Sequence, residues 1–188
     1  LDICEVSGVP LNPEENWSLD IDRVKNEIRP NTKLISINFP NNPTGAILAK
    51  ERLDELIRIC RNRGLYLFSD EVYRLLERDT KLRLPQIADI YERGISLNVM
   101  SKAYGLPGLR LGWIMCKDET ILQNMERYKH YLSICNSAPS EHLSMIALKA
   151  KEQILDRNRT LINANIKILG EFFNEFSDLF DWVIPDGS

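Results

Sequence analysis

Short apolar runs alternate with amphipathic helical segments over the first 116 residues, and this alternation constrains the fold more than any other sequence feature. Four runs have the apolar, turn-bounded character of strands: residues 33–38, 65–69, 95–100 and 109–116. From Lys50, apolar residues recur at helical spacing, and Gly64 is expected to end that helix. The pattern predicts a three-layer α/β fold, in which a mostly parallel sheet carries helices on both faces.

Helices are expected on either side of this alternating region. An earlier helix is predicted over residues 22–28, with Asp20 or Asp22 as its N-cap. Beyond Lys117 the pattern is helical only, with predicted helices over residues 118–132, from Pro139, and from about 160 to 179. The last helix has apolar residues at alternating spacings of four and three, which also occur in coiled coils. Two to three heptads are too few for that assignment, so we favour a domain-connecting helix packed on a core.

The composition excludes several classes of protein. The 188 residues are 44% hydrophobic and 27% charged, with a formal net charge of −3 and a pI near 5.5, so no nucleic-acid-binding surface is indicated. No apolar run approaches the roughly 18 residues of a membrane span. The first residues have neither the basic head nor the long apolar stretch of a secretory signal, so none is expected there. Because the first residue is Leu1 rather than Met, we expect an excised piece of a longer chain.

The cysteines indicate a reducing compartment. The four residues form no C-x-x-C pair and no metal-like cluster: Cys4, Cys60, Cys116 and Cys135. We therefore expect reduced, buried and inert thiols in a cytoplasmic protein, and no metal site.

Polar clusters fall where three predicted strands end, and ligands of parallel sheets bind beyond those ends. The clusters are residues 42–45 (N-P-T-G), residues 70–73 (D-E-V-Y) and the pair Ser101 and Lys102. Each has an ordinary alternative: the first is a turn sequence, Asp70 is a possible cap for a helix over residues 71–76, and lysines are common in solvated loops. Their coincidence at three strand ends favours one shared crevice.

Residues 101–112, S-K-A-Y-G-L-P-G-L-R-L-G, resemble the S-K-x-x-G-L-x-G-x-R-x-G signature of fold-type I pyridoxal-phosphate enzymes, the class I/II aminotransferases. The segments N-P-T-G and D-x-x-Y resemble that family's other two cofactor motifs, in the same order along the chain. The resemblance implies that Lys102 forms a Schiff base with pyridoxal 5′-phosphate and then moves the substrate proton, for which a primary amine is required. It also implies that Asp70 stabilises the protonated pyridine nitrogen of the cofactor.

The remaining positions of the motifs are matched with one exception. By resemblance, Asn42 and Tyr73 hold the cofactor's 3-oxygen, while Ser101 and Arg110 bind its phosphate. An ordinary surface arginine is the alternative for Arg110. Many family members have another Ser three residues before the lysine, where this chain has Val99. We interpret this difference as that of a subgroup, with phosphate binding that depends on other groups.

The resemblance also predicts the organisation of the protein. Residues 1–158 would be part of the large cofactor domain, and residues 159–188 would be the connecting helix and the start of a truncated small domain. The family's phosphate turn, ring-stacking aromatic and carboxylate-binding arginine would lie outside this chain, so the fragment alone is predicted to be inactive. The full-length protein is expected to be a homodimer that acts on an amino acid and a 2-oxo acid.

Two other functions remain open from the sequence. One is a lyase, decarboxylase or synthase on the same fold, because contacts to the substrate decide which bond at Cα breaks. The other is a non-catalytic aminotransferase-like sensor domain of a transcription regulator, which a winged-helix segment upstream of Leu1 would favour.

Overall fold

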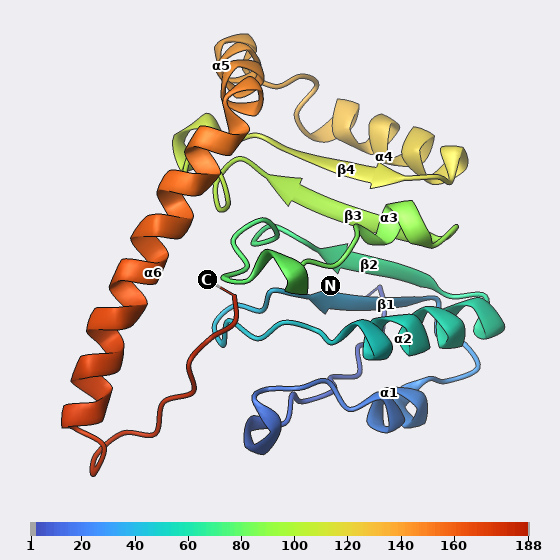
Figure 1. Cartoon of the computed structure of the whole chain (residues 1–188). Coiled ribbons are helices and arrows are strands. Elements are labelled where there is room, and N and C mark those ends of the chain that lie inside the picture. The colour runs from blue at the N-terminus through green and yellow to red at the C-terminus, as the bar shows by residue number, and fades with distance from the viewer. Residues whose placement is uncertain (1–2, 188) are drawn as a thin grey trace.

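The computed structural model describes residues 3–187 and contains a four-stranded sheet in the order β1-β2-β3-β4 (Figure 1). The strands are β1 (Leu34–Asn38), β2 (Tyr66–Asp70), β3 (Gly94–Val99) and β4 (Gly112–Cys116). The first three strands are parallel, and β4 pairs antiparallel with β3. The predicted α/β class is confirmed, with one antiparallel strand at the edge of a largely parallel sheet.

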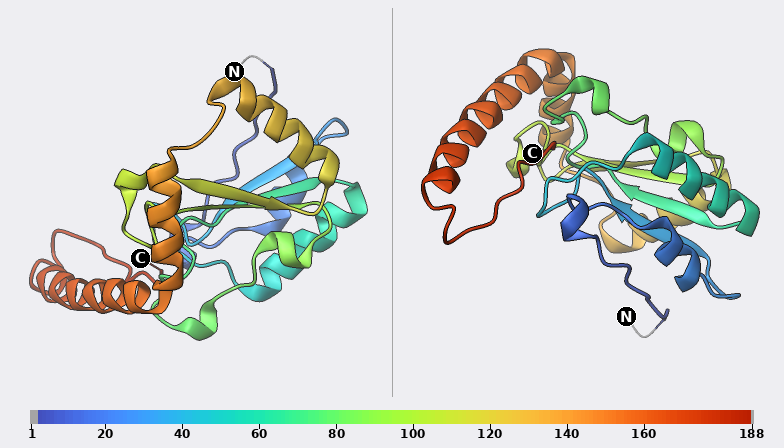
Figure 2. Two further views of the ribbon diagram at one scale, coloured as in Figure 1. Left: turned by 90° about the horizontal axis from the view of Figure 1, so that it is seen from above. Right: turned by 60° about the horizontal axis from the view of Figure 1, so that its bottom comes forward.

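Helices lie on both sides of the sheet, with α2 and α3 on one side and α4 on the other (Figure 2). The described residues form α1 (Ile21–Glu27), α2 (Lys50–Arg63), α3 (Ile87–Ile90), α4 (Glu119–Leu132), α5 (Ala138–Lys149) and α6 (Lys151–Glu175). The Asp20 carboxylate caps α1 by accepting from two backbone N–H groups, and Gly64 ends α2 at a φ of 66°. Both ends agree with the sequence prediction.

The long C-terminal helix differs from its predicted bounds. It begins at Lys151 rather than near residue 160, and its regular part ends at Glu175. Only Ala150, with φ −93° and ψ 17°, separates it from α5, and no Gly or Pro marks the break. The predicted domain boundary after residue 158 therefore falls inside α6. Among residues 3–187, no helix is both long and apolar enough to cross a membrane.

Two local details differ from the sequence patterns. Residues 72–75 form a turn, so the alternative of a helix over residues 71–76 with Asp70 as its cap is not observed. The last strand begins at Gly112 rather than at residue 109, because a 3-10 turn (Pro107–Leu109) and the left-handed Arg110 (φ 49°) precede it.

The main core lies between the sheet and the helices α1, α2 and α3. Leu56, Cys60 and Leu67 are fully buried there, and Ile87 and Tyr91 are 1% exposed. Burial raises the pKa of the Cys60 thiol to about 12, so this cysteine is inert as predicted. The prediction of buried thiols is wrong for the other three free cysteines, because Cys116 is half-buried and both Cys4 and Cys135 are exposed.

A second, smaller core lies between the segment after β3 and the helices α5 and α6. Met100 is fully buried in it, and Ala103, Tyr104 and Leu155 are between 3% and 6% exposed. Residues of α5 and α6 thus pack against the loop that contains Lys102.

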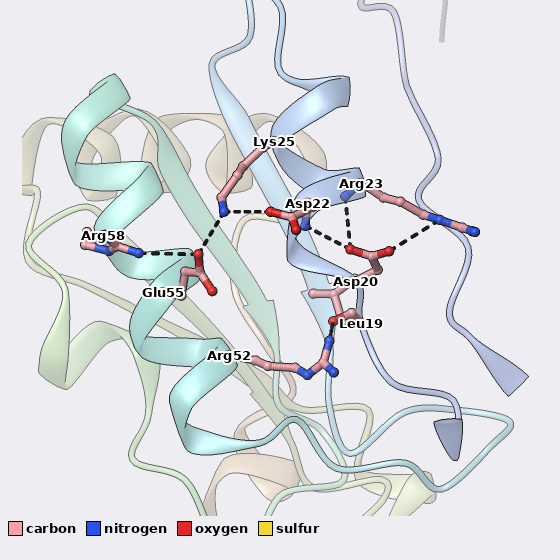
Figure 3. A network of polar contacts seen from close by, with 8 residues as sticks. All are labelled: Leu19, Asp20, Asp22, Arg23, Lys25, Arg52, Glu55 and Arg58. Atoms are coloured by element: carbon pink, nitrogen blue, oxygen red, sulfur yellow. Dashed lines mark hydrogen bonds and ion pairs between the residues drawn. The ribbon is translucent and has the colours of Figure 1, made fainter. Parts of the chain in front are cut away.

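Polar contacts join α1 to α2 at the edge of the main core (Figure 3). The Lys25 ammonium donates to the carboxylates of Asp22 and Glu55 at 2.8 Å each, and the Arg52 guanidinium donates to the carbonyl oxygen of Leu19. Most of these groups are solvent-exposed, so the ion pairs add little to stability. The apolar contacts of Val24 and Leu56 in the core below are the larger contribution.

Candidate functional site

The carboxyl ends of β1 and β2 are joined by one side chain, Asn38. This residue is the register partner of Asp70, and its amide nitrogen donates to the Asp70 carbonyl oxygen at 3.1 Å. The Asn38 side-chain oxygen accepts from the backbone N–H of Asn42 at 3.0 Å. Sequence reasoning missed this residue, although a polar side chain at the last position of an apolar strand was a usable signal.

The N-P-T-G segment forms a tight turn directly after β1. The Gly45 N–H donates to the carbonyl oxygen of Asn41 at 2.7 Å, and the Thr44 hydroxyl donates to the Asn41 side chain at 2.7 Å. Gly45 has a φ of 67°, and a Cβ there would lie 2.4 Å from the Cβ of Pro185, so only glycine fits. The turn leaves the Asn42 side chain exposed, and its amide donates to the Tyr73 hydroxyl at 3.3 Å.

Asp70 ends β2 with a half-buried side chain. One of its carboxylate oxygens accepts from the backbone N–H of Val72 at 3.2 Å, which closes a turn rather than capping a helix. That turn brings the half-buried Tyr73 over the strand ends, within reach of Asn42.

Lys102 lies in the loop after β3 and has an exposed side chain. Its Nζ is 5.4 Å from the centre of the Tyr73 ring, a cation–π distance. The backbone is turned here by a bond from the Gly105 N–H to the Lys102 carbonyl oxygen, at 2.9 Å. Tyr73 therefore contacts both Asn42 and Lys102, and the structure brings all three predicted motifs together at one sheet edge.

Two predicted phosphate ligands are less closely connected to this cluster. Ser101 is half-buried and directly precedes Lys102. Arg110 is exposed, and among the described residues its guanidinium bonds only within its own turn, to the Pro107 carbonyl oxygen at 3.2 Å. Val99, the residue that departs from the family pattern, packs against Gly112 of β4. A Cβ added to Gly112 would lie 2.8 Å from Val99 Cγ1.

The buried carboxyl group of Glu71 holds the segment that directly follows β2. Glu71 is 4% exposed, and its Oε1 accepts from the Ile87 N–H and the Ser96 hydroxyl, both at 2.9 Å. Burial raises the pKa of Glu71 above its ordinary value. The Ser96 oxygen accepts in turn from the Ala88 N–H at 3.0 Å, so the end of β2 is tied to β3 and to the start of α3. The sequence carried no signal for this contact beyond the position of Glu71 beside Asp70.

Two hollows among the described residues lie away from this cluster. A groove of about 850 Å³ lies between the N-terminal segment and β1, and a small cavity of about 30 Å³ lies beside Glu71 and Glu77. The two are not lined by Asp70, Tyr73 or Lys102. In the cluster itself Asn42 and Lys102 are exposed, while Asp70 and Tyr73 are half-buried.

The fold and this cluster define an α/β protein in which Tyr73 contacts both Asn42 and Lys102 near the end of the strand that Asp70 closes. Residues 2–187 match the family described as Aminotransferase class I and II, and the chain belongs to that family. The family predicted from the three motifs is confirmed.

Individual relatives agree with the family assignment. The chain is 29% identical over 183 residues to a probable aspartate aminotransferase of Methanocaldococcus jannaschii, covering 95% of this chain and 48% of that protein. It is 28% identical over 178 residues to capreomycidine synthase of Streptomyces vinaceus, covering 95% and 45%. The crystal structure of a PLP-dependent aminotransferase from Streptococcus suis superposes with a TM-score of 0.89 at 35% identity, covering 97% and 47%. The chain thus spans about half the length of these relatives.

Proposed function

We propose that this chain forms part of a pyridoxal-phosphate-dependent aminotransferase, which moves an amino group between an amino acid and a 2-oxo acid. The contact of Tyr73 with both Asn42 and Lys102 carries the proposal, because it joins three cofactor-type motifs in one place. Membership of the aminotransferase family and the names of the relatives support the same reaction.

The chemistry of the donor set fits the cofactor. Pyridoxal 5′-phosphate, when bound, would supply an aldehyde that condenses with amines and a ring that accepts electrons. The site offers one exposed amine, Lys102, and one half-buried carboxylate, Asp70, which suit the aldehyde and the ring nitrogen respectively. The Asn42 amide and Tyr73 hydroxyl would donate to the ring oxygen, and they already lie 3.3 Å apart.

Lys102 and its neighbours would also provide proton transfer and phosphate binding. The Lys102 amine would be the base that takes the proton from the substrate Cα and returns it at the cofactor's C4′ carbon. Ser101 and Arg110 would hold the phosphate group, the first by a hydroxyl and the second by a planar cation. Among the described residues the Arg110 guanidinium donates only through Nη1, to the Pro107 carbonyl oxygen, so its other N–H groups would be open to the phosphate.

The organisation of the whole protein follows from the same proposal. Residues 1–158 would belong to the large cofactor domain, and residues 159–188 would lead into a small domain. The complete protein would act in the cytoplasm as a homodimer, and the present chain alone would be inactive. Its coverage of about half of each relative supports this view, because the other half would supply further ligands.

A synthase reaction on the same site is the second candidate. The similarity to capreomycidine synthase extends over 95% of the chain, as far as that to the aminotransferase of M. jannaschii. Both reactions would use Lys102 and Asp70 in the same way, and substrate contacts would decide between them.

A half-reaction assay tests the proposal and separates the candidates. The complete product of the encoding reading frame is loaded with cofactor and incubated with single amino acids, and 2-oxo acids are measured by chromatography. An aminotransferase yields one 2-oxo acid per cofactor without a second substrate, whereas a synthase consumes amino acid and yields none. Lys102→Ala should lower the rate at least about 10³-fold, since it removes both covalent and acid–base catalysis. Lys167→Ala, on an exposed face of α6, is the matched control.

A further inference from the structure

Two consecutive residues of α6 contact the two loops that carry the site. The Asn158 amide nitrogen donates to the Ala103 carbonyl oxygen at 2.8 Å, and the Arg159 guanidinium donates to the Leu75 carbonyl oxygen at 3.3 Å. Ala103 directly follows Lys102, and Leu75 lies two residues after the Tyr of the second motif. One helix of 25 residues therefore bonds both loops through adjacent positions.

The Asn158 contact is held from several sides. The Asn158 side-chain oxygen accepts from the Arg157 guanidinium at 3.0 and 3.1 Å, which orients the amide so that its nitrogen faces Ala103. Ala103 is 3% exposed and packs in the second core with Leu155, one turn before Asn158 on the same helix. Gly105 (φ 66°) lies on the other side, where a Cβ would be 3.4 Å from the Asn158 amide nitrogen.

The Arg159 contact holds a strained residue. Leu75 has a φ of 84°, which a leucine adopts only at a cost in free energy. Its N–H donates to the Glu77 carboxylate at 3.0 and 3.1 Å, and its carbonyl oxygen accepts from Arg159. Charged side chains thus bond both sides of this residue, and one of them comes from α6.

The loop of Lys102 depends on such outside support. Within it, the Gly105 N–H donates to the Lys102 carbonyl and the Leu106 N–H to the Met100 carbonyl, at 2.9 and 3.0 Å. The lysine side chain is exposed and contacts the Tyr73 ring, so the position of its amine depends on where this loop holds its backbone relative to Tyr73.

We propose that Asn158 is a positioning residue for Lys102, and that together with Arg159 it sets the distance between Lys102 and Tyr73. The inference rests on the proposed role of Lys102 in binding the cofactor. It adds that α6, a helix with no residue among the predicted ligands, determines where that amine lies.

Asn158→Asp is the sharpest test, because it keeps the shape of the side chain but places a carboxylate oxygen against the Ala103 carbonyl. Asn165→Asp makes the same change of charge at an exposed position of α6 and serves as the control. In the cofactor-free protein we expect amide hydrogen exchange at Gly105 and Leu106 to become about tenfold faster in the first variant only, as for the loss of one good hydrogen bond. Asn158→Ala, which removes the donor without adding charge, should also make amide hydrogen exchange at Gly105 and Leu106 faster.

The second measurement addresses the lysine itself. Cofactor is added to the complete protein at increasing concentration, and its attachment to Lys102 is trapped with borohydride and quantified by mass spectrometry. We expect the half-saturating concentration to rise about tenfold in Asn158→Asp and in Asn158→Ala, with an unfolding midpoint close to that of the control. The pH at which the absorbance of the bound cofactor changes should also shift in both Asn158 variants and stay constant in Asn165→Asp.

The outcomes separate the two proposals. Unchanged exchange at Gly105 and Leu106, or faster exchange with unchanged attachment at Lys102, would overturn the positioning role while the proposed function stands. If the wild-type protein itself attaches no cofactor at Lys102, the proposed function fails, and the positioning role fails with it.

Discussion

Replacing Glu71 by alanine should lower the free energy of unfolding by about 2–6 kcal/mol, because it leaves two buried donors without a partner, each worth about 1–3 kcal/mol. The donors are the Ile87 N–H and the Ser96 hydroxyl, which both lie 2.9 Å from Glu71 Oε1. Ile87 is 1% exposed and Ser96 is fully buried, so neither donor is in contact with bulk water. The loss is therefore predicted to be larger than that of an exposed hydrogen bond.

Glu71→Gln separates the hydrogen bonds from the charge. Glutamine keeps the side-chain oxygen that accepts both bonds, so we expect it to stay within about 1 kcal/mol of wild type at pH 7. Burial raises the pKa of Glu71 in the folded state, so the folded protein holds this proton more tightly than the unfolded chain. This stabilisation is complete below the pKa that Glu71 has in the unfolded chain, and it is lost as the pH rises through the pKa that Glu71 has in the folded protein. Glutamine does not titrate, so its variant cannot show this pH dependence.

Urea denaturation followed by circular dichroism, at several pH values from 4 to 8, measures both effects. The advantage of wild type over Glu71→Gln should shrink as the pH rises. Equal losses for the alanine and glutamine variants, or a loss below about 1 kcal/mol for alanine, would refute the reasoning from buried donors.

Two further predictions concern chemistry and packing. Asp70→Ala should leave covalent attachment of the cofactor intact but slow proton removal from the amino acid at least about 100-fold, because the cofactor ring loses its charged partner. Exchange of the Cα proton with deuterated water measures this rate. A near-normal rate would show that Asp70 does not have this role. Leu56→Ala should cost about 3 kcal/mol in urea denaturation, because Leu56 is fully buried in the main core. Leu161→Ala, at a position 60% exposed on α6, should cost far less, and equal costs would contradict the assignment of the core.

The strands and α2 were predictable from the sequence because short, turn-bounded apolar runs and apolar residues at helical spacing both reflect burial. Leu56 and Cys60, one helical turn apart, are both fully buried as that spacing requires. The start of α6 was missed because its first turns mix charges with few apolar residues, and because only Ala150 interrupts the helical backbone before it. Breaks without Gly or Pro leave no composition signal.

The site was predictable in part for a related reason. The ends of parallel strands share one sheet edge, so the convergence of Asn42, Tyr73 and Lys102 followed from the order of strands and motifs. The contacts that orient them did not follow, because they depend on the rotation and register of elements distant in sequence. The bond from Asn158 to Ala103 joins residues 55 positions apart, and no local pattern encodes it.

The proposed function depends above all on Lys102 as the residue to which the cofactor attaches. Borohydride reduction of the complete, cofactor-loaded protein, followed by peptide mass spectrometry, identifies the attachment site. We expect a pyridoxyl mass on the peptide that contains Lys102, and none in Lys102→Ala treated in the same way. A label on another lysine, or no label in the wild-type protein, would contradict this assignment of Lys102.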